Sequence, residues 1–147
     1  MAPPGSGLRD YLGYWLARLS DEVHRSFERQ LAEQGVTVAQ WRVLMTVYRE
    51  HATSTSAVAR FINTDVGAVS RLVDRLTAKG LMERSSHPDL RRRKGLALTP
   101  AGRELVPELI HLADDTEATF FGCLTSSERS DLSQLLQNLL PASARPD

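Results

Sequence analysis

A chain of 147 residues is long enough to bury a hydrophobic core and short enough to be one domain, or one subunit of an intimate dimer. Charged residues make up 24% of the chain and hydrophobic residues 41%, ordinary values for a soluble globular protein that exclude a largely disordered chain. No apolar run approaches the roughly 18 residues of a membrane-spanning helix, so no membrane partner is expected.

Cysteine and histidine content further limit the function classes. A single cysteine, Cys123, excludes a disulfide within the chain, and with four scattered histidines it argues against a zinc site. The first residues lack the basic and apolar segments of a signal peptide, so the cytoplasm is the expected location. Residues 1–7 are predicted to be a disordered lead-in, and residues 141–147 a flexible tail.

The net charge of zero conceals an uneven distribution. Residues 60–94 carry nine basic and four acidic side chains, a net charge of +5. Residues 100–147 carry three basic and eight acidic side chains, a net charge of −5. A molecule divided in this way can present its basic part to a polyanion while its acidic part stays away from it. The alternative is that the basic segment is merely a solvated surface and that the acidic helices have no relation to it.

The first part of the chain is expected to form a long amphipathic helix. Apolar residues recur at steps of three and four from Leu8 to Leu31, which places them on one helical face. Gly35 follows, close to the position at which glycine commonly ends a helix. Thr37 and Gln40 then have the spacing of a capping box, which predicts a second helix.

Two further helices are expected after the polar connector at residues 53–56. A short one is followed by the cap and turn residues Asn63-Thr64-Asp65, and a longer one runs from about Val66 to Lys79. Gly80 ends the longer helix. Its apolar residues, expected to point inward, are Val69, Leu72, Val73 and Leu76.

The pattern then changes to that of a β-hairpin. Residues 81–85 can extend, residues 87–89 have turn chemistry, and Leu96 and Leu98 alternate with small residues at a period of two. Thr99 and Pro100 then cap and open a long helix. Pro107 lies inside that helix, so either a kink or a short turn followed by a new helix is expected.

A second capping box at residues 125–128 opens the last helix. Its apolar residues are Leu132, Leu135, Leu136, Leu139 and Leu140. The fold class is therefore mainly α with a small β-hairpin.

Helix, short helix, turn, helix and basic hairpin follow one another in the order of a winged helix-turn-helix. The helix from Val66 to Lys79 would bury its apolar face and present the other to the major groove of DNA. The residues expected to contact DNA from this helix are Gly67, Ala68, Ser70, Arg71 and Arg75. Those expected to contact phosphates or the minor groove from the hairpin tip, the wing, are Arg91, Arg92, Arg93 and Lys94. The alternative is that these arginines lie on an ordinary surface helix and that the hairpin tip is a solvated basic loop. Each of these features is common alone, but the two in this order are less common.

Three segments together resemble the MarR family of bacterial transcriptional regulators. They are residues 80–84 (GLMER), residues 88–92 (PDLRR) and residues 96–102 (LALTPAG), and residues 69–76 (VSRLVDRL) resemble the recognition helix of the family. The resemblance covers roughly residues 8–140. It implies a homodimer in which residues 37–99 form the DNA-binding lobe and residues 8–34 and 100–140 form dimerisation helices. It also implies a repressor or activator, with repression as the expected sign, whose DNA binding a small aromatic or acidic effector relieves.

The wing departs from the family pattern. The family usually has Asp-x-Arg at a fixed distance before its Leu-Thr, and here Asp89-Leu90-Arg91 stands one residue early relative to Thr99. Whether Asp89 orients the wing is therefore open. Either Arg91 or Arg92 is expected to reach deepest into the groove.

The apolar faces of the first and last helices independently favour a homodimer. They offer more apolar surface than a small lobe would bury, although an intramolecular helical bundle is the alternative. A dimer predicts a pseudo-palindromic operator with half-sites about one helical turn apart, on the order of 34–36 Å. The residues expected at the dimer interface are Leu12, Phe120, Leu132, Leu136 and Leu139.

Effector sensing has weaker signals in the sequence. Tyr11, Trp15 and Arg18 are candidates for an aromatic-acid pocket near the dimer interface, with ordinary packing as the alternative. Cys123 lies beside apolar residues and is predicted to be a small buried hydrophobe rather than a redox switch. No cofactor is expected.

Two other function classes remain for comparison. No nucleophile motif, phosphate-binding glycine loop or His-Glu-x-x-His motif is present, so the chain is not expected to be an enzyme. A helical protein-interaction module without specific DNA binding would explain the leucine stripes. It would not explain a basic hairpin after a basic helix face.

Overall fold

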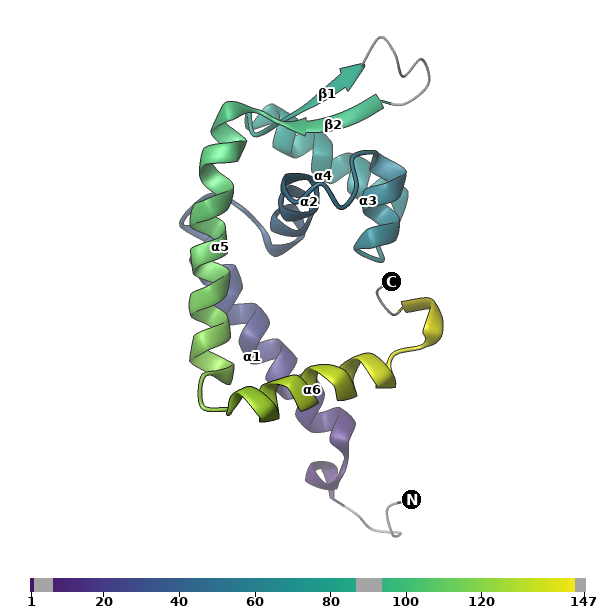
Figure 1. The fold of residues 1–147 in the computed structure, drawn as a ribbon, viewed down its shortest axis with the longest axis vertical. Coiled ribbons are helices and arrows are strands. Elements are labelled where there is room, and N and C mark those ends of the chain that lie inside the picture. The colour runs from purple at the N-terminus through teal and green to yellow at the C-terminus, as the bar shows by residue number, and fades with distance from the viewer. Residues whose placement is uncertain (2–6, 87–93, 145–147) are drawn as a thin grey trace.

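A computed structural model of the chain describes residue 1, residues 7–86 and residues 94–144. Within these residues the protein is mainly helical, with one two-stranded antiparallel sheet, which confirms the expected fold class (Figure 1). The helices are α1 (Leu12–Ala32), α2 (Val38–Tyr48), α3 (Thr55–Phe61), α4 (Val66–Ala78), α5 (Pro100–Phe121) and α6 (Ser126–Leu139). The strands are β1 (Met82–Ser86) and β2 (Lys94–Leu98), and short 3₁₀ turns span η1 (Leu8–Asp10) and η2 (Ala142–Ala144).

Helices α2, α3 and α4 and the hairpin form a compact lobe at one end of the molecule (Figure 1). Its core is aliphatic, and the side chains of Val43, Leu44, Val58, Val69 and Leu76 are all fully buried in it. Burial of such side chains is the main favourable contribution to folding. The lobe is therefore a rigid support for whatever its surface carries.

Local sequence signals start the helices of the lobe. Thr37 Oγ1 accepts a hydrogen bond from the Gln40 backbone N–H at 3.1 Å, and Gln40 Oε1 accepts one from the Thr37 N–H at 3.1 Å. This is the expected capping box, which satisfies two backbone donors at the start of α2. Gly35 and Gly80 follow α1 and α4 with φ of +71° and +72°, the left-handed conformation that favours glycine.

The expected unbroken helix from Leu8 is wrong at its start. Residues Leu8–Asp10 form a 3₁₀ turn, and Tyr11 is extended before α1 begins at Leu12. The Asp10 carboxylate accepts a hydrogen bond from the Gly7 N–H at 2.8 Å and closes this turn. The local hydrogen bond competes with the helical one, as short acidic side chains commonly do.

The hairpin is fixed to the lobe by backbone hydrogen bonds. Its strands pair with Met82 opposite Leu98 and Arg84 opposite Leu96. The Leu96 N–H donates to the Thr53 carbonyl at 2.7 Å, and Ser54 forms a β-bridge with Gly95. The connector before α3 thus acts as a short third strand, which holds the base of the hairpin in place.

Helices α1 and α5 cross below the lobe and share its core. Phe27 and Leu31 of α1 are buried with Val106 and Leu109 of α5. Helix α5 continues through Pro107 without restarting, so the alternative of a short turn followed by a new helix is wrong. The packed faces of α1 and α5 support it at that point, as tertiary contacts can for a proline inside a helix.

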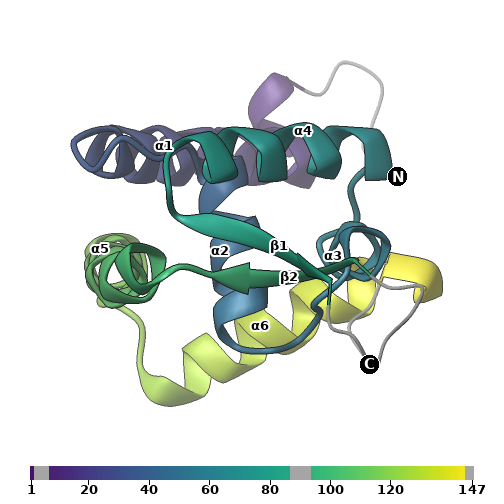
Figure 2. The ribbon, with the colours of Figure 1, turned by 90° about the horizontal axis from the view of Figure 1, so that it is seen from above.

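Helix α6 follows the lower end of α5 and crosses the molecule below the lobe (Figures 1 and 2). Its capping box is the expected one, with the Thr125 N–H donating to Glu128 Oε1 at 3.0 Å. That backbone hydrogen bond lowers the pKa of the exposed Glu128 carboxyl from its ordinary value. None of the described helices combines the length and apolar character that crossing a membrane would require.

Candidate nucleic-acid interface

Helix α4 presents one buried and one open face. Asp65 caps its N-terminus, with Oδ2 accepting from the Ala68 N–H at 3.0 Å. Val69, Val73 and Leu76 are fully buried, whereas Leu72 is half-buried. Because the buried residues recur at helical spacing, the opposite face stands away from the core. Seen from above, α4 lies beside the hairpin at the same end of the molecule (Figure 2).

The open face of α4 carries the residues predicted to contact DNA. Gly67, Arg71 and Arg75 are exposed, and Ala68 and Ser70 are half-buried. Among the described residues, no hydrogen bond or ion pair engages the guanidinium of Arg71 or Arg75. Both cations are therefore available for base edges or phosphates, the contacts that arginine makes best.

Two basic side chains next to this face, those of Arg84 and Lys79, already have partners. Arg84 of β1 donates to Asp74 Oδ1 at 2.7 Å and lies 3.3 Å from the Ser70 carbonyl oxygen. Lys79 turns away from the open face and donates to Gln40 Oε1 at 3.1 Å and to the Gly35 carbonyl. Asp74, the one acidic residue in α4, is thereby neutralised, which keeps the open face basic. The sequence places Asp74 and Lys79 on this face but gives no sign of their partners.

Replacing Arg84 with alanine is expected to lower DNA affinity about fivefold, because it leaves the Asp74 carboxylate unpaired beside DNA phosphates. Adding Asp74→Asn should recover most of that loss. The slope of log affinity against log salt, measured by fluorescence anisotropy, should stay close to that of the wild type. A slope reduced by about one, with no rescue by Asp74→Asn, would instead mean that Arg84 binds a phosphate itself.

The predicted wing residues fall largely outside the part of the chain that the structure describes. Arg91, Arg92 and Arg93, together with Asp89, lie in residues 87–93, which are not described. Lys94 begins β2, where its backbone pairs with that of Ser86. The strands β1 and β2, which come before and after this segment in the chain, lie beside α4 (Figure 2).

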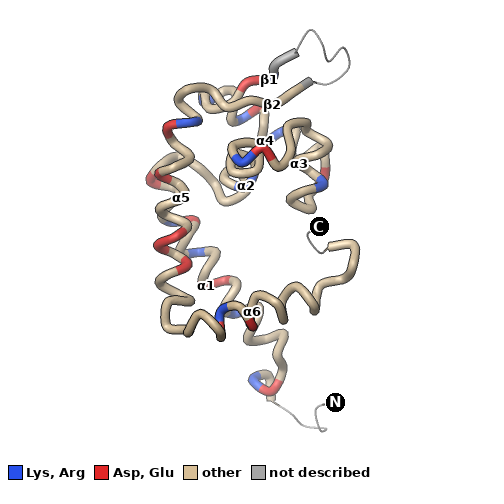
Figure 3. The backbone as a smooth tube through the Cα atoms, viewed as in Figure 1, with Lys and Arg blue, Asp and Glu red and all other residues tan. Residues whose placement is uncertain are grey.

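The residues predicted for dimerisation lie at the opposite end of the molecule. In the single chain, Leu12 is 86% exposed and Leu139 is 77% exposed, whereas Phe120 and Leu132 are half-buried. No described residue of α6 is buried, although its leucines share one face. Exposed apolar surface of this extent is typical of a protein interface. Figure 3 shows acidic residues recurring along α5, below the lobe that carries Arg71 and Arg75.

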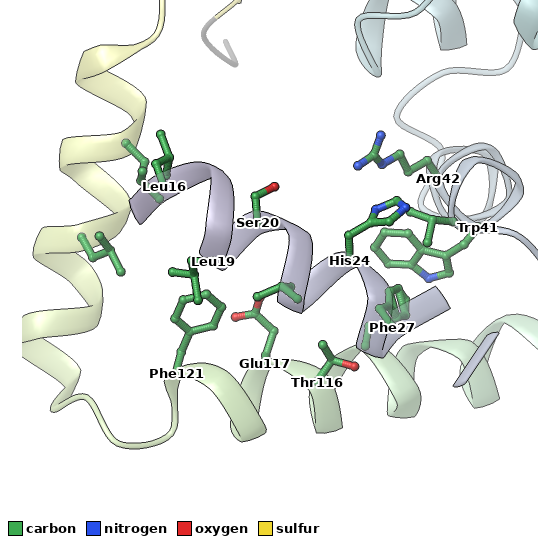
Figure 4. A pocket seen from close by; sticks show the side chains of 15 residues that line it. Leu16, Leu19, Ser20, His24, Phe27, Trp41, Arg42, Thr116, Glu117 and Phe121 are labelled. Carbon is green, nitrogen blue, oxygen red and sulfur yellow. The ribbon is translucent and has the colours of Figure 1, made fainter. Parts of the chain in front are cut away.

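A cavity of about 420 Å³ lies between α1, α2, α5 and α6 (Figure 4). Its wall is mostly apolar, with Phe27 and Trp41 packed edge to face, their ring centroids 4.9 Å apart. The indole N–H of Trp41 is buried and has no hydrogen-bond partner among the described residues, which costs about 1–3 kcal/mol.

Glu117, Arg42 and His24 are the ionisable residues that line the cavity. Glu117 forms an ion pair with Arg129 of α6 at 2.6 Å and is neutralised. Arg42 reaches over the cavity from α2, near His24, and forms no ion pair with another described residue (Figure 4). The cavity is thus an apolar site beside an arginine that no acidic residue in the described part of the chain neutralises.

The residues predicted for an effector pocket lie elsewhere. Tyr11 and Trp15 do not line this cavity, and the Trp15 indole N–H donates to the Arg9 carbonyl at 2.7 Å. Arg18 borders a shallow surface depression and donates to the Tyr14 hydroxyl at 3.1 Å, a hydrogen bond that raises the pKa of the guanidinium. Sequence reasoning missed Trp41 and Arg42, because a tryptophan in an amphipathic helix indicates packing.

The prediction that Cys123 is buried is wrong for the single chain. Cys123 is exposed and lies in the turn between α5 and α6. Phe120 and Phe121 are the last residues of α5 and are half-buried, whereas Cys123 follows in the turn and is exposed.

Comparison with known proteins gives a consistent result. The family model described as MarR family matches residues 36–94. A putative transcriptional regulatory protein for the hcr operon of Thauera aromatica is 30% identical over 129 residues, which are 87% of this chain and 78% of that protein. A mutant of MarR from Escherichia coli complexed with operator DNA has a TM-score of 0.80 and 26% identity, covering 92% of this chain and 100% of that one. CouR from Rhodococcus jostii, bound to p-coumaroyl-CoA, has a TM-score of 0.82 and 26% identity. The match covers 92% of this chain and 95% of CouR.

Proposed function

The chain belongs to the MarR family of transcriptional regulators, and from this premise we propose that it is a repressor that binds a pseudo-palindromic operator as a homodimer and is released by a small-molecule effector. The resemblance noted in the sequence is confirmed. The protein is a DNA-binding transcriptional regulator that acts as a dimer, not an enzyme. The cytoplasm is its proposed location, since that is where its DNA would be.

The guanidinium groups of Arg71 and Arg75, which have no partner among the described residues, carry the proposal. Arg71 and Arg75 lie one helical turn apart on a helix whose other side is fixed in the lobe core, so their positions are defined before DNA binds. We assign residues 37–99 to the DNA-binding lobe. The proposed contacts from α4 are Gly67, Ala68, Ser70, Arg71 and Arg75, and those from the wing are Arg91, Arg92, Arg93 and Lys94.

The proposed effector site is the cavity between α1, α2, α5 and α6. One structural relative is bound to p-coumaroyl-CoA, and DNA binding by BpsR from Bordetella bronchiseptica is regulated by 6-hydroxynicotinic acid. An apolar cavity beside the Arg42 guanidinium suits an aromatic molecule that carries negative charge. Tyr11, Trp15 and Arg18 remain a separate prediction, which an unchanged effector response of Trp15→Phe and Arg18→Gln variants would remove.

Fluorescence anisotropy on a labelled duplex from the DNA that flanks the coding region tests the regulator. The control is a scrambled duplex of equal composition, and both are titrated at two salt concentrations. With roughly 6–10 phosphate contacts, affinity for the flanking duplex should fall about 10³–10⁵-fold between about 50 and 200 mM salt. Weak binding to both duplexes would favour the interaction-module alternative for this chain.

Alanine in place of Arg71 or Arg75 should lower affinity for the operator by about 1–3 kcal/mol per half-site, roughly 5- to 150-fold. Because base contacts specify sequence, affinity for the scrambled duplex should change much less. Arg91→Ala and Arg92→Ala should weaken binding to both duplexes alike, since phosphate contacts carry no sequence information. Equal losses on both duplexes for all four variants would contradict this division of roles.

A further inference from the structure

The effector cavity does not end at Trp41. A second cavity of about 300 Å³ lies between α2 and α3, and the lining residues of the two cavities have Trp41 and Arg42 in common. The second cavity continues past Met45 to Arg49 and to Phe61 of α3. Arg42 and Arg49 are seven residues apart on one helix, which is about 10 Å along its axis. The two cavities therefore meet at Trp41 and Arg42, and together they follow α2. The two together are called the groove.

The second part of the groove favours an anion. It is lined by Arg42 and Arg49 and by no acidic residue within the described part of the chain. No ion pair with another described residue neutralises either guanidinium; that of Arg49 lies 5.8 Å from the centre of the Tyr48 ring. Two unpaired arginines at the edge of a concave surface are the usual means of holding phosphate oxygens.

The same part of the groove also offers a flat aromatic surface. The rings of His51 and Phe61 are stacked, with centroids 4.8 Å apart and planes 13° from parallel. Phe61 is 56% exposed although it is a large apolar residue in a short helix. A stacked pair with an open ring is suited to receive a third planar ring, such as a nucleobase.

We propose that this groove binds one elongated ligand: an aromatic acyl group in the cavity between α1 and α5, joined to a phosphate-bearing nucleotide tail that lies along α2. Arg42 and Arg49 hold the phosphates, and Phe61 stacks on the base. A coenzyme A thioester of an aromatic acid has this chemistry. The inference rests on the proposed effector site, but it assigns to the ligand a second part that a free aromatic acid lacks.

Isothermal titration of the full-length protein with benzoyl-CoA, sodium benzoate and coenzyme A tests the proposal. Benzoyl-CoA should bind more tightly than either of its two parts, because only it fills both parts of the groove. Arg49→Gln should weaken the binding of benzoyl-CoA about tenfold and leave that of benzoate unchanged. Arg60→Gln is the matched control, since Arg60 is also an exposed arginine of the lobe but lines neither cavity.

The outcomes separate this inference from the proposed function. No binding of benzoyl-CoA, equal affinity for benzoate, or equal losses in the Arg49→Gln and Arg60→Gln variants would overturn the elongated groove. Operator binding by the same samples is measured separately by anisotropy. Its absence in the wild type would count against the regulator, and its presence in Arg49→Gln would show that the variant is folded.

Discussion

Glutamate in place of both Leu12 and Leu139 is expected to convert the dimer into monomers and to lower operator affinity by about 10²–10⁴-fold. In the single chain both leucines are largely exposed, so the folding of the protomer should be little affected. At the interface of a dimer each would place a carboxylate in an apolar contact, and burying an unpaired charge is costly. Operator affinity falls because a monomer binds one half-site, whereas in a dimer the binding of one half-site raises the effective concentration of the second lobe at the other.

Light scattering with size-exclusion chromatography measures the mass, and anisotropy measures operator binding. The control is a variant with glutamate at Ser130 and Gln134, which adds two negative charges to the polar face of α6. This control should remain a dimer and should bind the operator with nearly wild-type affinity. If the Leu12 and Leu139 variant also remained dimeric, these faces of α1 and α6 would not form the interface.

Helix boundaries in the lobe could be predicted from the sequence because local chemistry determines them. The Thr37–Gln40 capping box and Gly80 are short-range signals, and the structure shows each where it was expected. The inward residues of α4 also follow from helical periodicity, since one strongly amphipathic pattern has one way to bury its apolar side. The start of α1 was missed because the Gly7–Asp10 hydrogen bond is an alternative that periodicity does not detect.

Contacts between distant residues could not be predicted in the same way. Arg84 and Asp74 are ten residues apart, and Lys79 and Gln40 are thirty-nine apart, so no local pattern relates them. The effector cavity has the same origin, because residues from four helices line it and only packing brings them together. Tyr11 and Trp15 were proposed for it on residue type alone, which cannot distinguish a cavity wall from an exposed helix end.

Replacing Gly102 with alanine is expected to destabilise the protein, although alanine is the better helix former by about 1 kcal/mol. Gly102 lies in the first turn of α5, and a Cβ built there would stand 2.1 Å from the Leu81 carbonyl oxygen. The Thr99 N–H donates to that same oxygen at 3.2 Å, and Thr99 Oγ1 caps α5 by accepting from the Gly102 N–H at 3.1 Å. The obstacle is therefore backbone, which cannot move aside as a flexible side chain can.

We expect Gly102→Ala to lower the free energy of unfolding by about 1–3 kcal/mol and the melting temperature by on the order of 5–10 °C. Operator affinity should also fall, since this close approach sets the angle at which the lobe meets the dimerisation helix α5. Ala101→Val is the control: it adds more volume at the preceding, exposed position and should cost less than about 1 kcal/mol. A rise in melting temperature for Gly102→Ala would show that helix propensity outweighs the contact, and that the lobe and α5 can separate without cost.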